Sequence, residues 1–296
     1  MIRRVESEGQ ARANDGRTLA FVERGAADGM PVLVCHGTPG SRLTRHPDPT
    51  MYERHGVRMV AYDRPGYGRS DPRLGRSVAD AAADIAAIAD ELGFERFAVV
   101  GGSGGAPHAL ACGALLGDRV VRVGALVTPA PSDSPDFDFF TDLAEINVKE
   151  FGAAVQGREA IEAHLQAYVD ELRRDPHAVV EEISSELPDR DREILSRPEV
   201  REVLIDSFVE AVRQGTRGWA DDDLAFAKPW GFDLEDVESE TRLWQGELDV
   251  LAPHSHGEYV ASRLPNARFE LLEGGGHFLD EEWAIVLDWL AAPARV

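Results

Sequence analysis

Residues 99–110, VVGGSGGAPHAL, place four glycines around Ser103, directly after an apolar run that is typical of a buried strand. A glycine-rich turn between a strand and a helix can bind a mononucleotide phosphate, bind a dinucleotide pyrophosphate, or present a nucleophile. A phosphate-binding loop needs a lysine, and none lies nearby. The dinucleotide pattern G-x-G-x-x-G/A, registered on Gly102 and Gly104, would put Pro107 at its last position. The segment instead matches G-x-S-x-G, which predicts a nucleophile elbow at Ser103.

The geometry of such an elbow accounts for two of the glycines. The serine adopts a backbone with φ > 0, and the strand and helix approach so closely that the positions two before and two after it must be small. Gly101 and Gly105 meet this requirement, whereas the pattern assigns no role to Gly102. A flexible turn with an incidental serine fits the same pentapeptide, so the interpretation depends on partners for the hydroxyl.

A serine nucleophile needs a base that accepts its proton at neutral pH. His277 ends the segment ARFELLEGGGHF, where a predicted strand runs into three glycines, and this context favours it among the nine histidines. His108 follows Ser103 on a predicted helix and is expected to be packed or at the surface. His254 and His256 lack a third ligand at a metal-binding spacing, so they are expected to begin a solvated helix, and no metal site is predicted.

The base in turn needs a carboxylate that holds it in one tautomer. Asp249 in GELDVLAP follows a predicted strand, and the chain order is then serine, aspartate, histidine. Glu247 is expected at the end of that strand, pointing elsewhere. Asp133, which follows the apolar run VVRVGALV, is the alternative acid.

Acyl transfer also needs backbone N–H groups that bind the oxyanion of the transition state. The loop HGTPGSR follows the apolar run PVLVC. Pro39 has no N–H, so Thr38 is the expected first donor, and Gly104 is the expected second. His36 and Gly37 are expected to shape this loop and to border the substrate.

The remaining chain alternates between strand-like and helix-like segments. Asn14–Arg17 predicts a hairpin turn between two antiparallel strands. Short apolar runs that end in glycine-rich loops predict strands covered on both faces, and SVADAAADIAAIADELG predicts a helix capped by Ser77. This alternation predicts an α/β fold with a mostly parallel central sheet flanked by helices.

A long segment interrupts that alternation. Between residues 131 and 237, amphipathic patterns such as REAIEAHLQAYVDELRRD replace the strand-like runs. We therefore predict a core made of residues 1–130 and 238–296, and an all-helical cap made of residues 131–237. Within the cap, Trp219, Phe140 and Trp230 are candidate substrate contacts, and residues 221–223, three consecutive aspartates, are expected to form a solvated acidic turn.

The sequence resembles the α/β-hydrolase superfamily in HGTPGSR, DRPGYGRSD, GGSGG, GELDVLAP and GGGHF, which occur in the expected order over most of the chain outside the helical segment. The resemblance implies an α/β-hydrolase fold of the esterase and serine-peptidase branch, with Asp63 as a structural hydrogen-bonding residue. Prolyl aminopeptidases of this superfamily have a second glycine at the position of Thr38 and usually a tryptophan at that of Gly104. The serine at position 103 also argues against haloalkane dehalogenases and epoxide hydrolases, which use aspartate.

These features predict a serine hydrolase that cleaves an ester, lactone or amide of a small to medium apolar molecule through an acyl-enzyme, without a cofactor. One alternative is the same triad used for carbon–carbon bond hydrolysis, for a lyase reaction or for tailoring of secondary metabolites. The other is a ligand-binding protein of the same fold without catalysis.

Charge and cysteine content limit the partners and the compartment. The formal net charge is −22, with acidic residues spread along the chain, so nucleic acid and anionic membranes are not expected partners. Cys35 and Cys112 lie in apolar surroundings and are interpreted as small core residues. No segment reaches the roughly 18 apolar residues of a membrane span, and no apolar run follows the N-terminal arginines. We expect a cytoplasmic protein and leave its oligomeric state open.

Overall fold

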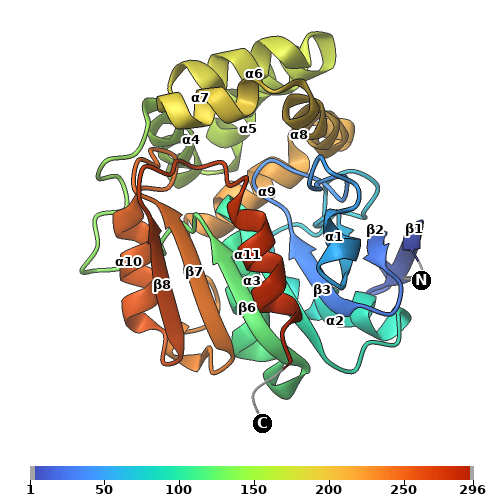
Figure 1. Cartoon of the computed structure of the whole chain (residues 1–296). Coiled ribbons are helices and arrows are strands. Elements are labelled where there is room, and N and C mark those ends of the chain that lie inside the picture. Colours follow the sequence, from blue (N-terminus) through green and yellow to red (C-terminus); the bar gives the residue numbers. More distant parts are fainter. Residues whose placement is uncertain (1–3, 294–296) are drawn as a thin grey trace.

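The computed structural model describes residues 4–293, which form a central eight-stranded sheet with helices on both of its faces (Figure 1). The strands pair in the order β1-β2-β4-β3-β5-β6-β7-β8. Their bounds are β1 Arg4–Arg12, β2 Thr18–Ala26, β3 Met30–Cys35, β4 Val57–Tyr62, β5 Phe97–Gly102, β6 Val120–Leu126, β7 Glu240–Gly246 and β8 Ala267–Leu272. The pairs β1·β2 and β2·β4 are antiparallel, and all other pairs are parallel. The predicted fold class is confirmed.

The antiparallel end of the sheet begins with the predicted hairpin. The N–H of Ala13 donates to the carbonyl of Arg17 at 2.9 Å, and Gly16 has φ +86°. Glycine takes this left-handed backbone without the steric penalty that a Cβ brings.

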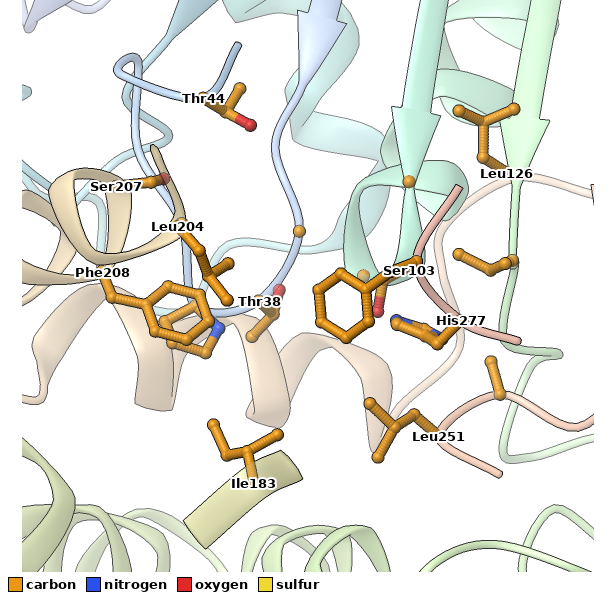
Figure 2. A pocket seen from close by; sticks show the side chains of 18 of the residues that line it. Thr38, Thr44, Ser103, Leu126, Ile183, Leu204, Ser207, Phe208, Leu251 and His277 are labelled. Atoms are coloured by element: carbon orange, nitrogen blue, oxygen red, sulfur yellow. The ribbon is translucent and has the colours of Figure 1, made fainter. Parts of the chain in front are cut away.

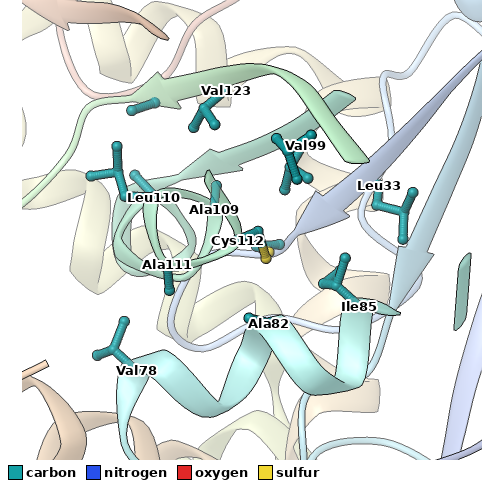
Figure 3. Close-up of a cluster of buried hydrophobic side chains, with 14 of the residues drawn as sticks. Leu33, Val78, Ala82, Ile85, Val99, Ala109, Leu110, Ala111, Cys112 and Val123 are labelled. Atoms are coloured by element: carbon teal, nitrogen blue, oxygen red, sulfur yellow. The ribbon is translucent and has the colours of Figure 1, made fainter. Parts of the chain in front are cut away.

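Two apolar clusters sandwich the sheet. On one face, α2 (Ala81–Glu91), α3 (Ala106–Leu115) and α10 (His254–Arg263) pack against the strands, and Figure 3 shows side chains of α2 and α3 meeting those of the strands there. On the other face, α1 (Met51–Arg54) and α11 (Glu282–Ala291) cover the strands. Both free cysteines are buried in the first cluster, as expected. The Ser77 hydroxyl forms a capping box with Asp80, as the predicted helix start requires.

The chain between β6 and β7 has no strand within the described residues. Its helices are α4 Glu145–Gln156, α5 Arg158–Arg174, α6 Pro176–Ser185, α7 Asp189–Ser196, α8 Pro198–Ala211 and α9 Arg217–Phe226. We call residues 131–237 the helical insertion. Figure 1 shows its helices gathered beyond one edge of the sheet, with α9 nearest the strands. A third apolar cluster joins α5, α6 and α9 to one another, and Tyr67 of the core enters it.

No helix within residues 4–293 combines the length and the apolar character that crossing a membrane requires.

Candidate active site

Ser103 stands at the sharp turn between β5 and α3. Its φ is +52°, as the nucleophile elbow predicts, and such backbone strain in a non-glycine residue costs on the order of 1 kcal/mol. A Cβ added to Gly101 would lie 2.2 Å from the carbonyl oxygen of Gly105, and one added to Gly105 would lie 2.0 Å from that of Cys35. Both positions therefore require glycine, because strand, turn and neighbouring strand are in backbone contact.

Gly102 differs from these two glycines. A Cβ there would meet only the Cβ of Leu126, at 3.9 Å, which is ordinary van der Waals contact. The structure thus gives no steric reason for this glycine.

The elbow opens into a cavity of about 340 Å³ between the sheet and the helical insertion. Its floor comes from segments that follow β3, β5, β6, β7 and β8, so it lies at the carboxyl edge of the parallel strands. Its roof is mostly apolar and includes Phe151, Leu172, Ile183, Leu204, Phe208 and Trp219. Figure 2 shows Ser103 and His277 at this floor, with Leu204, Phe208 and Ile183 facing them.

His277 is held by Asp249. The Nδ1 atom of His277 lies 2.9 Å from Oδ2 and 3.0 Å from Oδ1 of Asp249, which is 4% exposed. The same carboxylate accepts N–H bonds from Leu251 and Ala252 at 2.9 Å and from the Gln245 side chain at 3.2 Å. With Nδ1 donating to Asp249, Nε2 of His277 is free of its proton and can accept one.

The pKa of His277 reflects two opposing influences. Burial lowers it, but the charge and hydrogen bond of Asp249, followed by the charge of Asp191, raise it above its ordinary value. The imidazolium form is therefore favoured in this site, which suits a group that must accept a proton. Within the described residues, no hydrogen bond joins Ser103 Oγ to His277, and such bonds often tighten only when substrate binds.

The alternative acids lie elsewhere. Asp133 is exposed and is not part of the cavity lining. Glu247 accepts the N–H of Gly274 at 2.8 Å, so it faces the loop after β8 and not His277.

The loop after β3 borders the elbow. A Cβ added to Gly37 would lie 3.7 Å from Ser103 Cβ, and both Gly37 and Thr38 line the cavity. The Thr38 hydroxyl donates to Asp222 at 2.9 Å and accepts from Arg64 at 2.9 Å. Its backbone N–H has no acceptor within residues 4–293, which leaves it available to a ligand. A Cβ added to Gly104 would lie 2.4 Å from Thr38 Oγ1, so threonine at 38 and glycine at 104 depend on each other.

A buried network of charged side chains holds the loop that contains Thr38. Asp222 of α9 is fully buried and accepts from Arg64 at 2.5 Å, from Tyr67 at 2.7 Å and pairs with Arg76 at 2.6 Å. Arg64 also donates to the carbonyls of His36 and Gly37. Burial would raise the pKa of Asp222, but the two arginines outweigh burial and hold it well below its usual range. The helical insertion thus contributes an ionised carboxylate directly behind the Thr38 loop.

His36 and Asp63 have structural contacts in the same region. Nδ1 of His36 donates to the carbonyl of Gly37 at 2.7 Å, while its Nε2 accepts the N–H of Arg64 at 3.2 Å. Burial and the nearby Arg64 lower the pKa of His36 well below its ordinary value, so the ring is neutral. Asp63 accepts the N–H groups of Arg42 and Arg69, the structural role that the resemblance implied. His36 does not line the cavity.

The prediction of a solvated acidic turn at residues 221–223 was wrong. All three aspartates lie on α9 and are at most 2% exposed. Successive helical residues point about 100° apart, so each carboxyl group has different neighbours. Asp221 pairs with Arg158, and Asp222 with Arg64 and Arg76. The flanking Trp219, Leu224 and Phe226 were the available signal that this segment is a buried helix.

Asp223 and Glu150 form an acidic pair in the cavity wall. The indole N–H of Trp219 donates to Glu150 at 2.7 Å. Burial raises the pKa of Glu150 to about 7, and burial together with the charge of Glu150 raises that of Asp223 well above its ordinary value. At neutral pH the pair therefore retains a proton, and it forms a polar patch in a mostly apolar lining.

Of the three predicted substrate contacts in the helical insertion, one lines the cavity and two do not. Trp219 lines the cavity, but Phe140 is 40% exposed and Trp230 is buried against Phe232, and neither is part of the lining.

The prediction of a solvated helix start at His254 and His256 was wrong for His256, which is fully buried. Its ring accepts the N–H of Ala130 and packs against the rings of Phe137 and Phe139.

The other two buried histidines, His256 and His108, are also neutral. Burial lowers the pKa of His256 to about 4 and, with the positive charge of Arg64, that of His108 to about 3. His108 is buried on α3 and donates to the carbonyl of Gly104 at 2.8 Å. In the part of the chain that the structure describes, no three His, Cys, Asp or Glu side chains are placed to hold a metal ion.

Comparison with known proteins supports the fold and a hydrolase. A family model for the alpha/beta hydrolase fold matches residues 30–157. A non-heme chloroperoxidase of Streptomyces lividans is 30% identical over 55% of this chain, which spans 58% of that protein. A 2-hydroxy-6-oxononadienedioate/2-hydroxy-6-oxononatrienedioate hydrolase of Pseudomonas putida is 28% identical over 88% of this chain and 87% of its own length. A thermophilic esterase of Thermogutta terrifontis superposes with a TM-score of 0.64 over 93% of this chain and 91% of its own, at 24% identity. Residues 30–157 thus match the family model for the alpha/beta hydrolase fold, and the described chain has the same fold as these hydrolases.

Proposed function

We propose that the protein is a serine hydrolase that cleaves an ester, lactone or amide of a small to medium apolar molecule. The observation that carries the proposal is the contact of His277 Nδ1 with both oxygens of a buried Asp249, at the same cavity floor as a serine with φ +52°. A proton acceptor held in one tautomer, beside a strained and accessible serine, is what acyl transfer requires.

In this proposal, Ser103 Oγ attacks the substrate carbonyl while His277 Nε2 accepts the hydroxyl proton. Asp249 keeps His277 oriented and stabilises the imidazolium. The N–H groups of Thr38 and Gly104 hold the oxyanion, each worth about 3 kcal/mol of transition-state stabilisation. His277 then protonates the leaving group. Water next attacks the acyl-enzyme while His277 accepts its proton, and His277 returns that proton to Ser103 Oγ as the acid product leaves.

The size and lining of the cavity support the substrate class. Its volume of about 340 Å³ is near the lower end of the range for small-molecule sites, about 300–1,000 Å³. In this proposal the helical insertion is a cap over the site, and its apolar side chains hold the acyl or alcohol part. The net charge of −22 argues against nucleic acid or an anionic membrane as partner, and two free buried cysteines suit a reducing cytoplasm.

Carbon–carbon bond hydrolysis by the same residues is the second candidate. The Pseudomonas putida relative, whose name describes a hydrolase of 2-hydroxy-6-oxo dienedioates, aligns with 88% of this chain. In this alternative the carbon–carbon bond next to a ketone is cleaved in place of an ester bond. A large preference for a vinylogous diketone over matched esters would favour it.

Labelling with a fluorophosphonate tests the proposal, because this probe reacts with an activated serine and not with an ordinary one. Wild type should be labelled, Ser103→Ala should not, and His277→Ala should be labelled far more slowly. His254→Ala is the matched control, since His254 lies outside the cavity, and it should behave as wild type. Labelling of Ser103→Ala at the wild-type rate would show that the nucleophile is wrong. No labelling and no burst with an activated ester in wild type would instead indicate a ligand-binding protein.

A further inference from the structure

Asp191 reaches from the helical insertion to the loop that carries His277. It lies in α7 and is fully buried. Its Oδ2 accepts the backbone N–H of His277 at 2.9 Å, and its Oδ1 accepts that of Phe278 at 2.9 Å. One carboxylate from the insertion therefore holds two consecutive peptide groups at the position of the base.

The loop after β8 has a space that fits this carboxylate. A Cβ added to Gly276 would lie 2.3 Å from both carboxylate oxygens of Asp191. Any other residue at 276 would push the carboxylate away from the two N–H groups. The third glycine of GGGHF thus has a specific partner in the insertion, 85 positions upstream (276 − 191).

The charge of Asp191 faces His277 without a cation to neutralise it. Within residues 4–293, Asp191 makes no ion pair with lysine or arginine. Burial raises the pKa of Asp191 above its ordinary value, and the N–H groups of Phe278 and His277 and the charge of His277 offset part of this rise. Peptide N–H groups of this kind stabilise a carboxylate in its ionised form.

Few other charged or titratable groups surround His277. Asp249 contacts its Nδ1, and Ser103 lies across the cavity floor. His256 of α10 faces Asp249 and is neutral at ordinary pH. The ion pair of Arg197 with Asp280, at 2.7 Å, lies at the cavity wall and carries no net charge.

We propose that Asp191 is a positioning residue for His277, which fixes the backbone of the base and adds a second negative charge beside the imidazolium. The inference rests on the proposed function for its catalytic consequence. Because Asp191 belongs to the helical insertion, the base reaches full strength only while α7 is seated against the loop after β8. The insertion then acts on the proton transfer as well as on the substrate.

The first test measures the pKa of His277 by NMR and does not depend on activity. Asp191→Asn removes the negative charge but keeps the size of the side chain, so the pKa of His277 should fall. Asp189→Asn, on the same helix and exposed, removes an equal charge and should leave the pKa unchanged. An unchanged pKa of His277 in Asp191→Asn would overturn the proposal.

The second test measures kcat and KM against pH with an activated ester. Catalysis needs neutral His277, so kcat/KM rises through its pKa, and a lower pKa moves this acidic limb to lower pH. Asp191→Asn should lower kcat at the plateau by about 10-fold or more with little change in KM, and should shift the limb. A purely structural residue would lower the amount of folded protein without moving the limb.

Asp191→Ser serves if Asp191→Asn does not fold, since the smaller hydroxyl still accepts one N–H. It should show the same fall in the pKa of His277, and a wild-type pKa in this variant would equally overturn the proposal. The two hypotheses fail separately. If Ser103 and His277 are not catalytic, wild type itself shows neither labelling nor turnover, while the NMR measurement still decides whether Asp191 acts on His277.

Discussion

The nucleophile elbow and helix α9 both contribute to the same cavity, but their contacts have different ranges along the chain. At the elbow, the contact that requires glycine at 101 is with Gly105, four positions away, and it follows from the space around the backbone, while Gly105 also meets the carbonyl of Cys35 on β3. On α9, the decisive contact joins Asp222 to Thr38, 184 positions away, and is made by charged and hydroxyl side chains. A site can therefore be recognisable from one short segment and still depend for its geometry on a distant one.

Replacing Asp222 should disrupt the long-range contact between α9 and the Thr38 loop. Asp222→Asn leaves Arg64 and Arg76 buried without their counter-charge, which typically costs about 3–5 kcal/mol of unfolding free energy. Urea unfolding measures this loss, and kcat of the folded variant should also fall because the Thr38 loop is no longer held. Asp221→Asn is the matched control on the same helix, because its partner Arg158 remains partly exposed and solvent can take over.

The control should lose about 1 kcal/mol or less. Equal losses of stability in the two variants would mean that the contacts of Asp222 with the core stabilise the protein no more than the ion pair of Asp221 does.

Gly104 and Thr38 link the two regions, and a double-mutant cycle measures how strongly. Gly104→Ala should destabilise the protein by about 1–3 kcal/mol, since its Cβ would lie 2.4 Å from Thr38 Oγ1. In a Thr38→Gly background the same substitution should cost less, with a coupling energy of about 1 kcal/mol. Additive effects in urea unfolding would show that the two departures from the aminopeptidase pattern are independent.

Glu150 should affect the dependence of stability on pH. Burial raises its pKa in the folded protein to about 7 from an ordinary value near 4.5, so the folded state retains a proton that the unfolded chain releases. The free energy of unfolding should therefore fall as pH rises from about 4.5 to 7, and the contribution of this group should be constant above that. Glu150→Gln should make the slope shallower by up to about 1.4 kcal/mol per pH unit.

Glu145→Gln, exposed on the same helix, is the control and should keep the wild-type slope in this pH window. A wild-type slope in Glu150→Gln would contradict the assignment of the retained proton to Glu150.

The features that sequence reasoning found are those with local causes. The hairpin at Gly16, the positive φ of Ser103 and the glycine at 101 follow from backbone sterics within a few positions, whereas the glycine at 105 is required by the backbone of β3. The placement of Asp249 and His277 followed from a weaker rule, that loops after parallel strands meet at one edge of the sheet. That rule brings the side chains to one edge but leaves their roles as a prediction.

The features it missed depend on contacts between distant segments. Asp222 was taken for part of a solvated turn because an aspartate is usually exposed, and nothing near it in the sequence reveals Arg64 or Arg76 as partners. Asp191 is one of three acidic residues in α7, and only the folded chain shows the two N–H groups from which it accepts hydrogen bonds. Phe140 and Trp230 were chosen as aromatic residues, but apolar character alone does not separate a cavity wall from a packed interior or an exposed loop.

The ion pairs of Asp222 also limit how this protein can be re-engineered. Exchanging the whole segment between β6 and β7 for that of a relative is a common way to seek new substrate preferences. Here a chimera with an uncharged residue at the position of Asp222 would leave Arg64 and Arg76 buried without a counter-charge. A graft therefore has to bring its own carboxylate to Arg64 and Arg76, or be accompanied by apolar replacements at both arginines.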